Sequence, residues 1–595
     1  MQFKRIKLRY RRGLKKNQKR LDAQLSSGED FIEKNLYGRL HKLKPVRRFV
    51  LAWVGLVVLL ILLVGAQDIS LSGYYQTLST IPGGIYSEGV PGYFTNSNPI
   101  YAQSDANLTI SRLIFGSLFT TNNQGQLVGE LASNYVVSDQ GRIYTVNLKP
   151  NLYWQDGQPL TSQDVVFTVD TIENTAADSP LYANWSGISA SAPNSTTVVF
   201  SLPNVLASFP QNLTVGIIPK HILASIPPDS LRSANFNTIS PVGAGPFAMQ
   251  AVQVKNGDNI NEEQVELELK PNPGYVLGEP KLDKFIVNVY ADQNQMFADF
   301  KSKYLTGMET TDLPPKNITN AGSIVEHSII LRAETMVFFK TSSGILSSQG
   351  VRNALVAGTN VPAIVDSLGY PTVEVNEPFL KSQYTYNPNY AQSSYNPATA
   401  VNLLNANGWT TIKNGIRYSG NQPLSFTLTA ANTYENRLVT NQLKQQWGRL
   451  GVLLNVQLLS SSDFATTLSF HQYDAALTSI TIGTDPDVYV YWSSTQANAT
   501  GSDNYNFSEF QDPVADQSLQ AGRVSLSPAL RAVNYGPFLQ EWQAKSPALG
   551  LYQPRLLYLT NGPVNGLDAN VLNSPVDRLN NVQNWEIRQA KVTDN

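Results

Sequence analysis

The chain has 595 residues, which is too many for a single hydrophobic core, so we expect two or more domains. Its net charge of −1 hides an asymmetry, because residues 1–48 hold sixteen Lys/Arg and four Asp/Glu whereas the remainder holds 28 basic and 41 acidic residues. The acidic remainder disfavours nucleic acid as a partner, and the absence of Cys excludes disulfides, thiolate chemistry and a lipid-anchor cysteine.

The asymmetry coincides with an apolar run. Residues 49–66 contain no charge over 18 positions, and Arg47 and Arg48 precede them. The positive-inside rule then predicts a cytoplasmic basic tail at 1–48, a transmembrane signal anchor at 49–66 and an exported remainder. Cleavage after Val64-Gly65-Ala66 is the alternative. Within the tail, Ser27 is expected to cap a short helix on anionic lipid, and a solvated lead that only fixes topology is the other interpretation.

The exported chain begins with a segment rich in Gly, Ser, Tyr and Pro at 67–92, which we interpret as a spacer. Alternating apolar residues then predict half-buried strands at 144–148, 198–202 and 265–269, and a helix is expected at 293–304.

The stretch 151–172 combines a turn and a capped helix. Asp156-Gly157 is a tight-turn pair, and Thr161 is expected to cap a helix in which Asp164 complements the dipole. Nothing in it resembles a nucleophile, base or metal ligand, so the stretch indicates a rigid corner.

From about Glu334 helices and strands alternate, which is typical of α/β lobes. The patterns predict helices at 350–365, 397–406, 435–451 and 527–544, and strands at 452–459 and 549–559.

The sequence contains no motif that is typical of a catalytic or metal-binding site. His41, His221, His327 and His471 stand at no metal-ligand spacing, and no nucleophile elbow or phosphate-cradling loop occurs. We therefore expect no enzyme activity, no catalytic residues, no bound metal and no cofactor. The 28 Tyr and eight Trp suit a broad, water-tolerant ligand cleft, although packing explains most single rings.

The run from Trp154 to Phe167 closely resembles the signature of the family-5 extracellular solute-binding proteins of ABC importers, the oligopeptide- and dipeptide-binding type. Further segments resemble that family in the same order: 113–131, 240–247, 272–307, 351–365, 400–409, 442–456 and 473–491. The resemblance covers about 93–567.

The resemblance implies an α/β, two-lobed periplasmic-binding-protein-like fold with a hinge, of the large three-subdomain type, preceded by one transmembrane helix. Mapped onto this chain, lobe I comprises 93–325 plus 546–595 and lobe II comprises 326–545. The lobes are expected to close on a ligand.

Site residues follow from the same resemblance. In peptide-binding members a strand before the Asp-Pro turn pairs with the peptide backbone, and an acidic residue four positions before the proline anchors its amino group. Here the proline is Pro486 and Ile482 occupies the anchor position, so recognition of a free amino terminus is in doubt. The expected ligand-binding residues are Ser479, Ile480, Thr481, Ile482, Asp485, Tyr491, Trp492, Tyr101 and Tyr552.

The function implied is the substrate-binding component of an ABC importer, expected as a monomer, that delivers peptides to permease subunits driven by ATPases. Nickel, haem or an oligosaccharide is an alternative ligand, for which His471 is the only nearby histidine. A surface adhesion or sensory module without transport is the alternative from another class, suggested by the basic tail. The ligand-binding part is expected outside the cell membrane, as the exported part of a single-pass protein.

Overall fold

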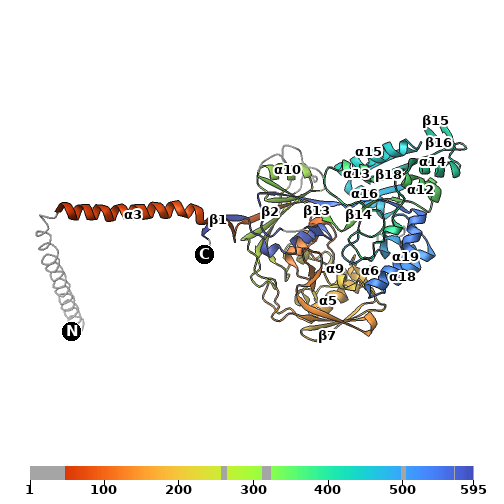
Figure 1. The fold of residues 1–595 in the computed structure, drawn as a ribbon. Helices are drawn as coiled ribbons and strands as arrows, with labels where there is room; N and C mark the ends of the chain where they lie inside the picture. The colour runs from red at the N-terminus through yellow and green to blue at the C-terminus, as the bar shows by residue number, and fades with distance from the viewer. Residues whose placement is uncertain (1–46, 256–263, 311–322, 498–503, 568–569, 594–595) are drawn as a thin grey trace. The chain divides into compact units, whose positions relative to one another are not determined.

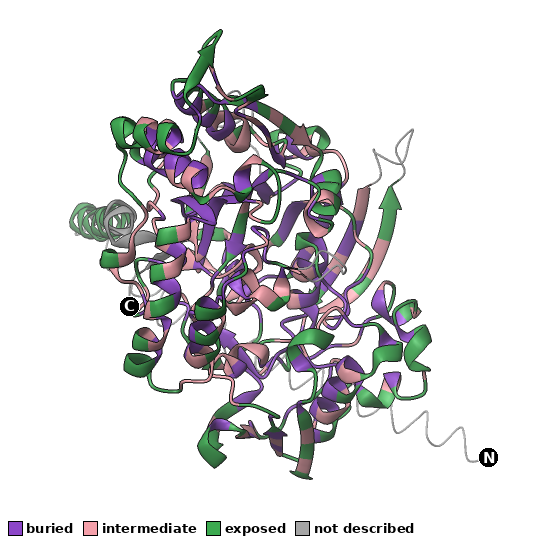
Figure 2. Cartoon of the chain, turned by 90° about the vertical axis from the view of Figure 1, so that its right-hand side faces the viewer, coloured by how far each residue is buried: buried purple, intermediate pink, exposed green. Residues whose placement is uncertain are grey.

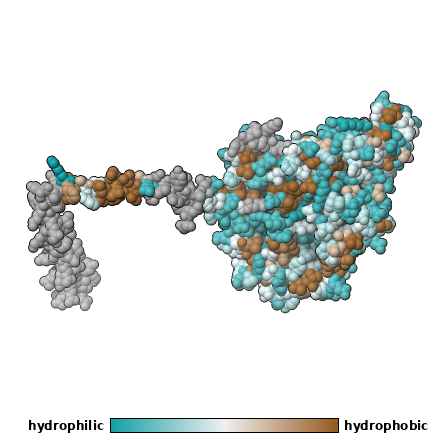
Figure 3. Space-filling view, viewed as in Figure 1, coloured by the Kyte–Doolittle hydropathy of each residue, from teal (hydrophilic) through white to brown (hydrophobic). Residues whose placement is uncertain are grey.

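The computed structural model describes residues 47–255, 264–310, 323–497, 504–567 and 570–593, so the tail helix predicted near Ser27 lies outside the described residues. The chain divides into two units, 1–79 with 589–595, and 80–588. In the first unit, α3 (Arg47–Tyr75) contains a 20-residue span, Arg48–Gln67, with a mean hydropathy of 2.9 and no burial. Hydrophobic side chains dominate this span (Figure 3). Length and composition allow this helix to cross a membrane.

The second unit contains an eight-stranded sheet (Figure 1). Its strands, in spatial order, are β23 (Val571–Leu572), β13 (Ile324–Leu331), β22 (Arg555–Asn561), β12 (Gly307–Thr310), β2 (Ile85–Pro91), β11 (Lys284–Tyr290), β10 (Gln264–Pro271) and β9 (Phe247–Lys255). We call the part of the chain around this sheet the eight-stranded half.

Strand β2 corrects the expected spacer at 67–92. It lies inside the eight-stranded sheet, parallel to β11 and β12, and five of its seven residues are buried. Tyr86 packs against Phe285 and Trp585, with ring centroids 5.2 Å away in both cases. The Gly- and Ser-rich composition gave no indication of this strand. Because its inward-facing side chains complete the core, residues 85–91 belong to the folded unit.

A smaller sheet completes the eight-stranded half. It has the order β5 (Ala132–Ser138), β6 (Ile143–Leu148), β8 (Thr197–Ser201) and β7 (Ser189–Asn194), and α5 (Ser162–Glu173) packs against it. The predicted turn and cap before α5 are confirmed, because Gly157 has a φ of 85° and Thr161 forms a capping box with Asp164. The other elements here are α4 (Asp105–Ile114), β3 (Phe119–Thr121), β4 (Leu127–Gly129), α6 (Tyr182–Trp185), α7 (Phe209–Asn212), α8 (Lys220–Leu223), α9 (Pro228–Leu231) and α10 (Gln293–Lys301).

The remaining chain is built around a five-stranded sheet, and we call it the five-stranded half. Its strand order is β19 (Leu453–Leu459), β18 (Ser425–Ala431), β20 (Ala475–Thr481), β14 (Ala333–Phe339) and β21 (Ala548–Tyr552). Alternate residues of β14 face two cores. Val337 and Phe339 pack with α12 (Gln349–Ala357), α13 (Val361–Ser367), α14 (Pro397–Ala406) and α15 (Tyr434–Gly448). Met336 and Phe338 pack with α18 (Pro513–Arg523) and α19 (Pro528–Lys545). Buried residues accordingly follow the strands and the inner helix faces (Figure 2).

The main chain crosses between the two sheets twice. Arg332 separates β13 from β14, and Gln553-Pro554 separates β21 from β22, so the single strand predicted at 549–559 is two strands in different sheets. Pro554 has no N–H for a continuous ladder. The crossings contact each other, because the Leu331 N–H donates to the Pro554 carbonyl at 2.9 Å. The lobe boundaries predicted after 325 and 545 stay predictions.

The helix predicted at 350–365 is also divided. Gly358 ends α12, and the Asn360 side chain caps α13 by accepting a hydrogen bond from the Ala363 N–H. Pro362 in the first turn of α13 cannot continue a preceding helix. The helix predicted at 397–406 is present with these bounds, and those predicted at 293–304, 435–451 and 527–544 are present with shifts at their ends.

Candidate functional site

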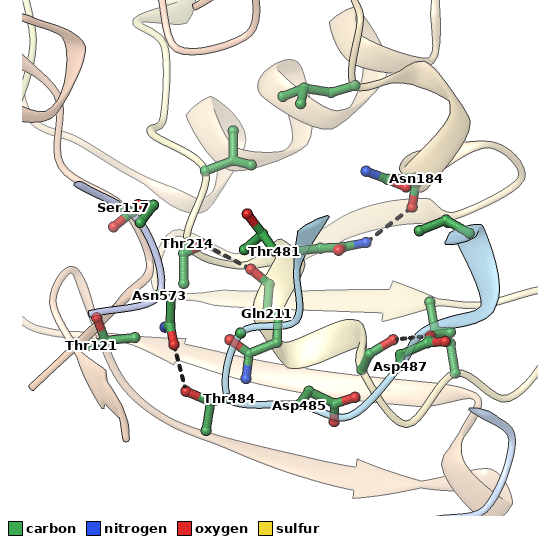
Figure 4. A pocket seen from close by; sticks show the side chains of 18 of the residues that line it. Ser117, Thr121, Asn184, Gln211, Thr214, Thr481, Thr484, Asp485, Asp487 and Asn573 are labelled. Carbon is green, nitrogen blue, oxygen red and sulfur yellow. Dashed lines mark hydrogen bonds between the residues drawn. The ribbon is translucent and has the colours of Figure 1, made fainter. Parts of the chain in front are cut away.

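A cavity of about 840 Å³ lies between the two halves. The eight-stranded half lines it with residues around Ser117 and Thr121, with the 202–216 segment and with the 573–580 segment. The five-stranded half contributes the chain from Thr481 to Asp487, followed by Tyr491 and Arg523. Figure 4 shows Thr481, Thr484 and Asp485 from one half facing Gln211, Thr214 and Asn573 from the other.

The local chain geometry explains why 481–487 forms a wall of this cavity. Strand β20 pairs antiparallel with β14 as far as Thr481, opposite Ala333. Beyond it, the N–H groups of Ile482 and Gly483 both donate to the Arg332 carbonyl at 2.9 Å. Gly483 has a φ of 71°, which favours glycine, and the chain turns there into the cavity.

Two sets of hydrogen bonds join the two halves around the cavity. Near the crossings, the Thr484 hydroxyl lies 2.6 Å from the Gly125 carbonyl oxygen and 3.0 Å from Asn573 Oδ1. Elsewhere on the rim, the Ser208 hydroxyl donates to Asp487 at 2.9 Å and the Ala207 N–H donates to the Arg523 carbonyl at 2.9 Å. We call this second set the rim latch. The cavity is therefore bounded by both halves and by hydrogen bonds between them.

Two of the carboxylates in the wall form ion pairs. Arg531 makes two hydrogen bonds to Asp485, at 2.7 and 2.5 Å, and burial of Asp485 raises its pKa against the opposing effect of this guanidinium. Asp487 lies 3.3 Å from the guanidinium of Arg523, which also stacks over the Tyr489 ring.

The other charged side chains of the wall belong to the eight-stranded half. Arg112 donates to the buried Glu130 at 2.9 Å and to Asn580 at 2.8 Å. Asp577 accepts hydrogen bonds from the N–H groups of Asn573 and Ser574, and burial raises its pKa.

Four of the predicted site residues line this cavity, namely Thr481, Ile482, Asp485 and Tyr491. The Tyr491 hydroxyl donates to the Thr481 carbonyl at 2.9 Å, so this ring covers the strand end.

The other five predicted residues lie elsewhere. Ser479 lines a second cavity of about 260 Å³, and Ile480 is in the core because side chains alternate along β20. Trp492 is fully buried, stacked on Phe338 with centroids 5.6 Å apart. Tyr101 and Tyr552 are also buried, and their hydroxyls donate to the Ala177 carbonyl and to Glu435.

The sequence patterns missed the residues that face 481–487. Gln211, Thr214, Asn573 and Asn580 lie in irregular or short elements and carry no motif, so only the fold brings them together. His471 is buried beside Glu509 and outside the cavity lining. Among the described residues, no group of three His, Cys, Asp or Glu side chains is arranged to hold a metal ion.

Comparison with known proteins gives a consistent family. Residues 126–501 match the model for the bacterial extracellular solute-binding proteins, family 5. A Brucella ovis protein named as a putative ABC transporter peptide-binding protein is 26% identical over 483 residues, covering 79% of this chain and 86% of that protein. The oligopeptide-binding protein AppA of Bacillus subtilis is 23% identical over 490 residues, with the same two coverages.

Solved structures share the fold. The structure of Bacillus subtilis AppA in complex with a nonapeptide has a TM-score of 0.71 at 20% identity, covering 86% of this chain and 100% of that one. The structure of NikZ from Campylobacter jejuni in complex with Ni(L-His) has a TM-score of 0.74 at 22% identity, covering 84% and 99%.

Proposed function

Because this chain belongs to the bacterial extracellular solute-binding proteins of family 5, we propose that it captures peptides between its two halves and delivers them to the permease of an ABC importer. The observation that carries the proposal is the cavity of about 840 Å³ bounded by both halves. Known ligand sites have volumes of about 300–1,000 Å³ and combine apolar walls with a few polar groups. The peptide-binding relatives support a peptide as the ligand.

Closure follows from the way the chain joins the halves. In the part of the chain that the structure describes, two crossings, at Arg332 and at Gln553-Pro554, connect the sheets. A ligand that contacts both walls stabilises the closed arrangement by its differential affinity, since neither wall alone offers all the contacts. The rim latch adds hydrogen bonds that form only when the halves meet.

The proposal includes a single-pass, monomeric protein anchored by α3, with residues 1–48 in the cytoplasm and the solute-binding part outside. The apolar span Arg48–Gln67 and the sixteen basic residues before position 49 support this topology. Protease treatment of intact cells should degrade the solute-binding part and spare an epitope placed at the N-terminus. Loss of that epitope, or release of the whole protein by a salt wash, would contradict the topology.

Binding can be tested with the full chain purified in detergent. We expect native mass spectrometry to detect co-purifying peptides and a peptide library to raise the melting temperature. Thr481→Trp should weaken both effects, because the ring would occupy part of the cavity at the end of β20, whereas the same substitution at the exposed Thr411 of β15 (Thr411–Lys413) should not. An empty protein that no peptide stabilises would refute the proposed ligand.

A further inference from the structure

The cavity offers a ligand almost no unpaired charge. Five charged side chains line it in the described part of the chain: Arg112, Asp485, Asp487, Arg523 and Asp577. Asp485 and Asp487 each face a guanidinium of their own half, and Arg112 faces the buried Glu130. Asp577 accepts two main-chain N–H groups on Oδ2 and the Asn580 amide at 3.5 Å on Oδ1, and Arg112 is the cation that acts on it. An ammonium or carboxylate of a ligand would have to compete with a partner already in place, which removes most of the gain from the new pair.

A further acid behind the wall does not change this balance. Glu334 of β14 is fully buried, does not line the cavity, and has no hydrogen-bond partner for either carboxylate oxygen among the described residues. Burial, reinforced by nearby Glu377, raises the pKa of Glu334 well above its ordinary value, which favours the neutral form.

The remaining polar groups of the wall are uncharged amides and hydroxyls. Gln211, Thr214, Asn573 and Thr481 come from three separated segments and surround the same space (Figure 4). Such groups both donate and accept, which matches the alternating N–H and C=O of a peptide main chain. A charged terminus finds no equivalent complement here.

Resting on the proposed function, we propose that this cavity encloses an uncharged length of peptide, bound through its main-chain amides, with no ionic anchor for either peptide terminus. The ligand class is then a peptide whose termini are blocked or lie outside the cavity. Binding should depend weakly on salt, because no net charge is neutralised when the complex forms.

Two matched libraries test this inference on the full chain in detergent. Both consist of peptides of six to nine residues without ionisable side chains, one with free termini and one acetylated and amidated. We expect half-saturating concentrations that agree within about threefold, less than 1 kcal/mol in binding free energy. If the library with free termini bound about tenfold more tightly or better, this inference would be overturned and the proposed function would stand. Binding of neither library would overturn it together with the proposed function.

Substitution of the wall carboxylates gives the second test. If Asp485 forms only its internal pair with Arg531, Asp485→Asn should change the affinity for both libraries by the same factor. A loss confined to the free library would identify Asp485 as an anchor for the peptide amine and refute the inference. Asp487→Asn repeats the test at the more exposed pair, should the first variant fail to fold.

Discussion

The neighbouring rings Tyr491 and Trp492 illustrate how one residue separates a binding position from a core position. Tyr491 is half-buried and lines the cavity, whereas Trp492 is fully buried between Phe338 and Trp542. The sequence predicts both as ligand contacts, because an aromatic cluster does not show which ring faces inward. Their orientation depends on α17 (Tyr489–Trp492), a single helical turn that no pattern indicates.

These positions give opposite predictions for truncation. Tyr491→Ala should weaken peptide binding while changing the unfolding free energy little. Trp492→Ala should destabilise the protein by about 3–5 kcal/mol, because it removes a buried ring and leaves a cavity. Urea denaturation and peptide titration of both variants separate the two effects. A stable Trp492→Ala protein with impaired binding would contradict this assignment.

The buried side chain of Glu377 is expected to make the stability of the protein depend on pH. Its side chain is buried, one oxygen accepts the Asn387 N–H, and burial raises its pKa to about 8. The unfolded state ionises near its ordinary pKa, so between about pH 4.5 and pH 8 the folded state retains a proton that the unfolded state has lost. Its contribution to stability is complete at lower pH and declines across this window, by at most about 1.4 kcal/mol per pH unit.

Glu377→Gln removes this titration. The variant should therefore show a shallower decline in the free energy of unfolding between pH 5 and pH 8 than the wild type. Glu541→Gln, at a partly exposed position on α19 paired with Lys545, serves as the control. Equal slopes in the Glu377→Gln variant and the wild type would show that Glu377 is ionised in the folded protein.

At the scale of elements, local sequence signals predicted those elements whose ends are marked by capping residues. Helix α5 begins at its capping box, and α14 begins at Asn396, whose side chain caps it. Local signals failed where tertiary context decides. The pattern at 549–559 is continuous in hydrophobicity although the chain changes sheets at Gln553-Pro554, and β2 has an unremarkable sequence. The site residues divide in the same way. Residues 481–487 lie in a segment that resembles the family and could be predicted, whereas residues 573–580 carry no motif and could not.

The cap of α5 gives a local stability prediction. Thr161 accepts the Gln163 N–H, while Asp164 accepts the Thr161 N–H and also the Lys220 N–H. Thr161→Ala should cost about 1 kcal/mol of unfolding free energy. Gln163→Ala, at an exposed position in the same turn, should cost less. If urea denaturation gave the same loss of unfolding free energy for both variants, the lost cap would not be the cause of the destabilisation.

At the scale of the whole solute-binding unit, the rim latch joins the two halves at a second place, apart from the Thr484 contacts. It uses Ser208, Asp487 and two main-chain groups, so it forms only when the halves approach. Ligand release requires these bonds to break together with the ligand contacts. The latch therefore contributes to the lifetime of the complex more than to its rate of formation.

Ser208→Ala should raise the dissociation rate of a bound peptide by about two- to tenfold, which corresponds to one hydrogen bond of about 0.5–1.5 kcal/mol. The association rate should change little. Stopped-flow displacement measures both rates, and Ser230→Ala, at an exposed position on α9, is the matched control. An unchanged dissociation rate would show that the latch is open in solution.

The double crossing also has a consequence for the order of folding. Strand β22 lies between β13 and β12, and the fully buried Arg578 pairs with Glu88, 490 residues earlier in the chain. The eight-stranded sheet therefore cannot be completed until the last part of the chain has been exported. The five-stranded half is formed by one continuous segment from Ala333 to Tyr552, so it has all its strands before the sheet that precedes it in sequence. Long-range pairing of this kind slows folding. During secretion the second half in sequence is then the first that can finish folding, while β12 and β13 must wait for β22, the neighbour that they share in the sheet.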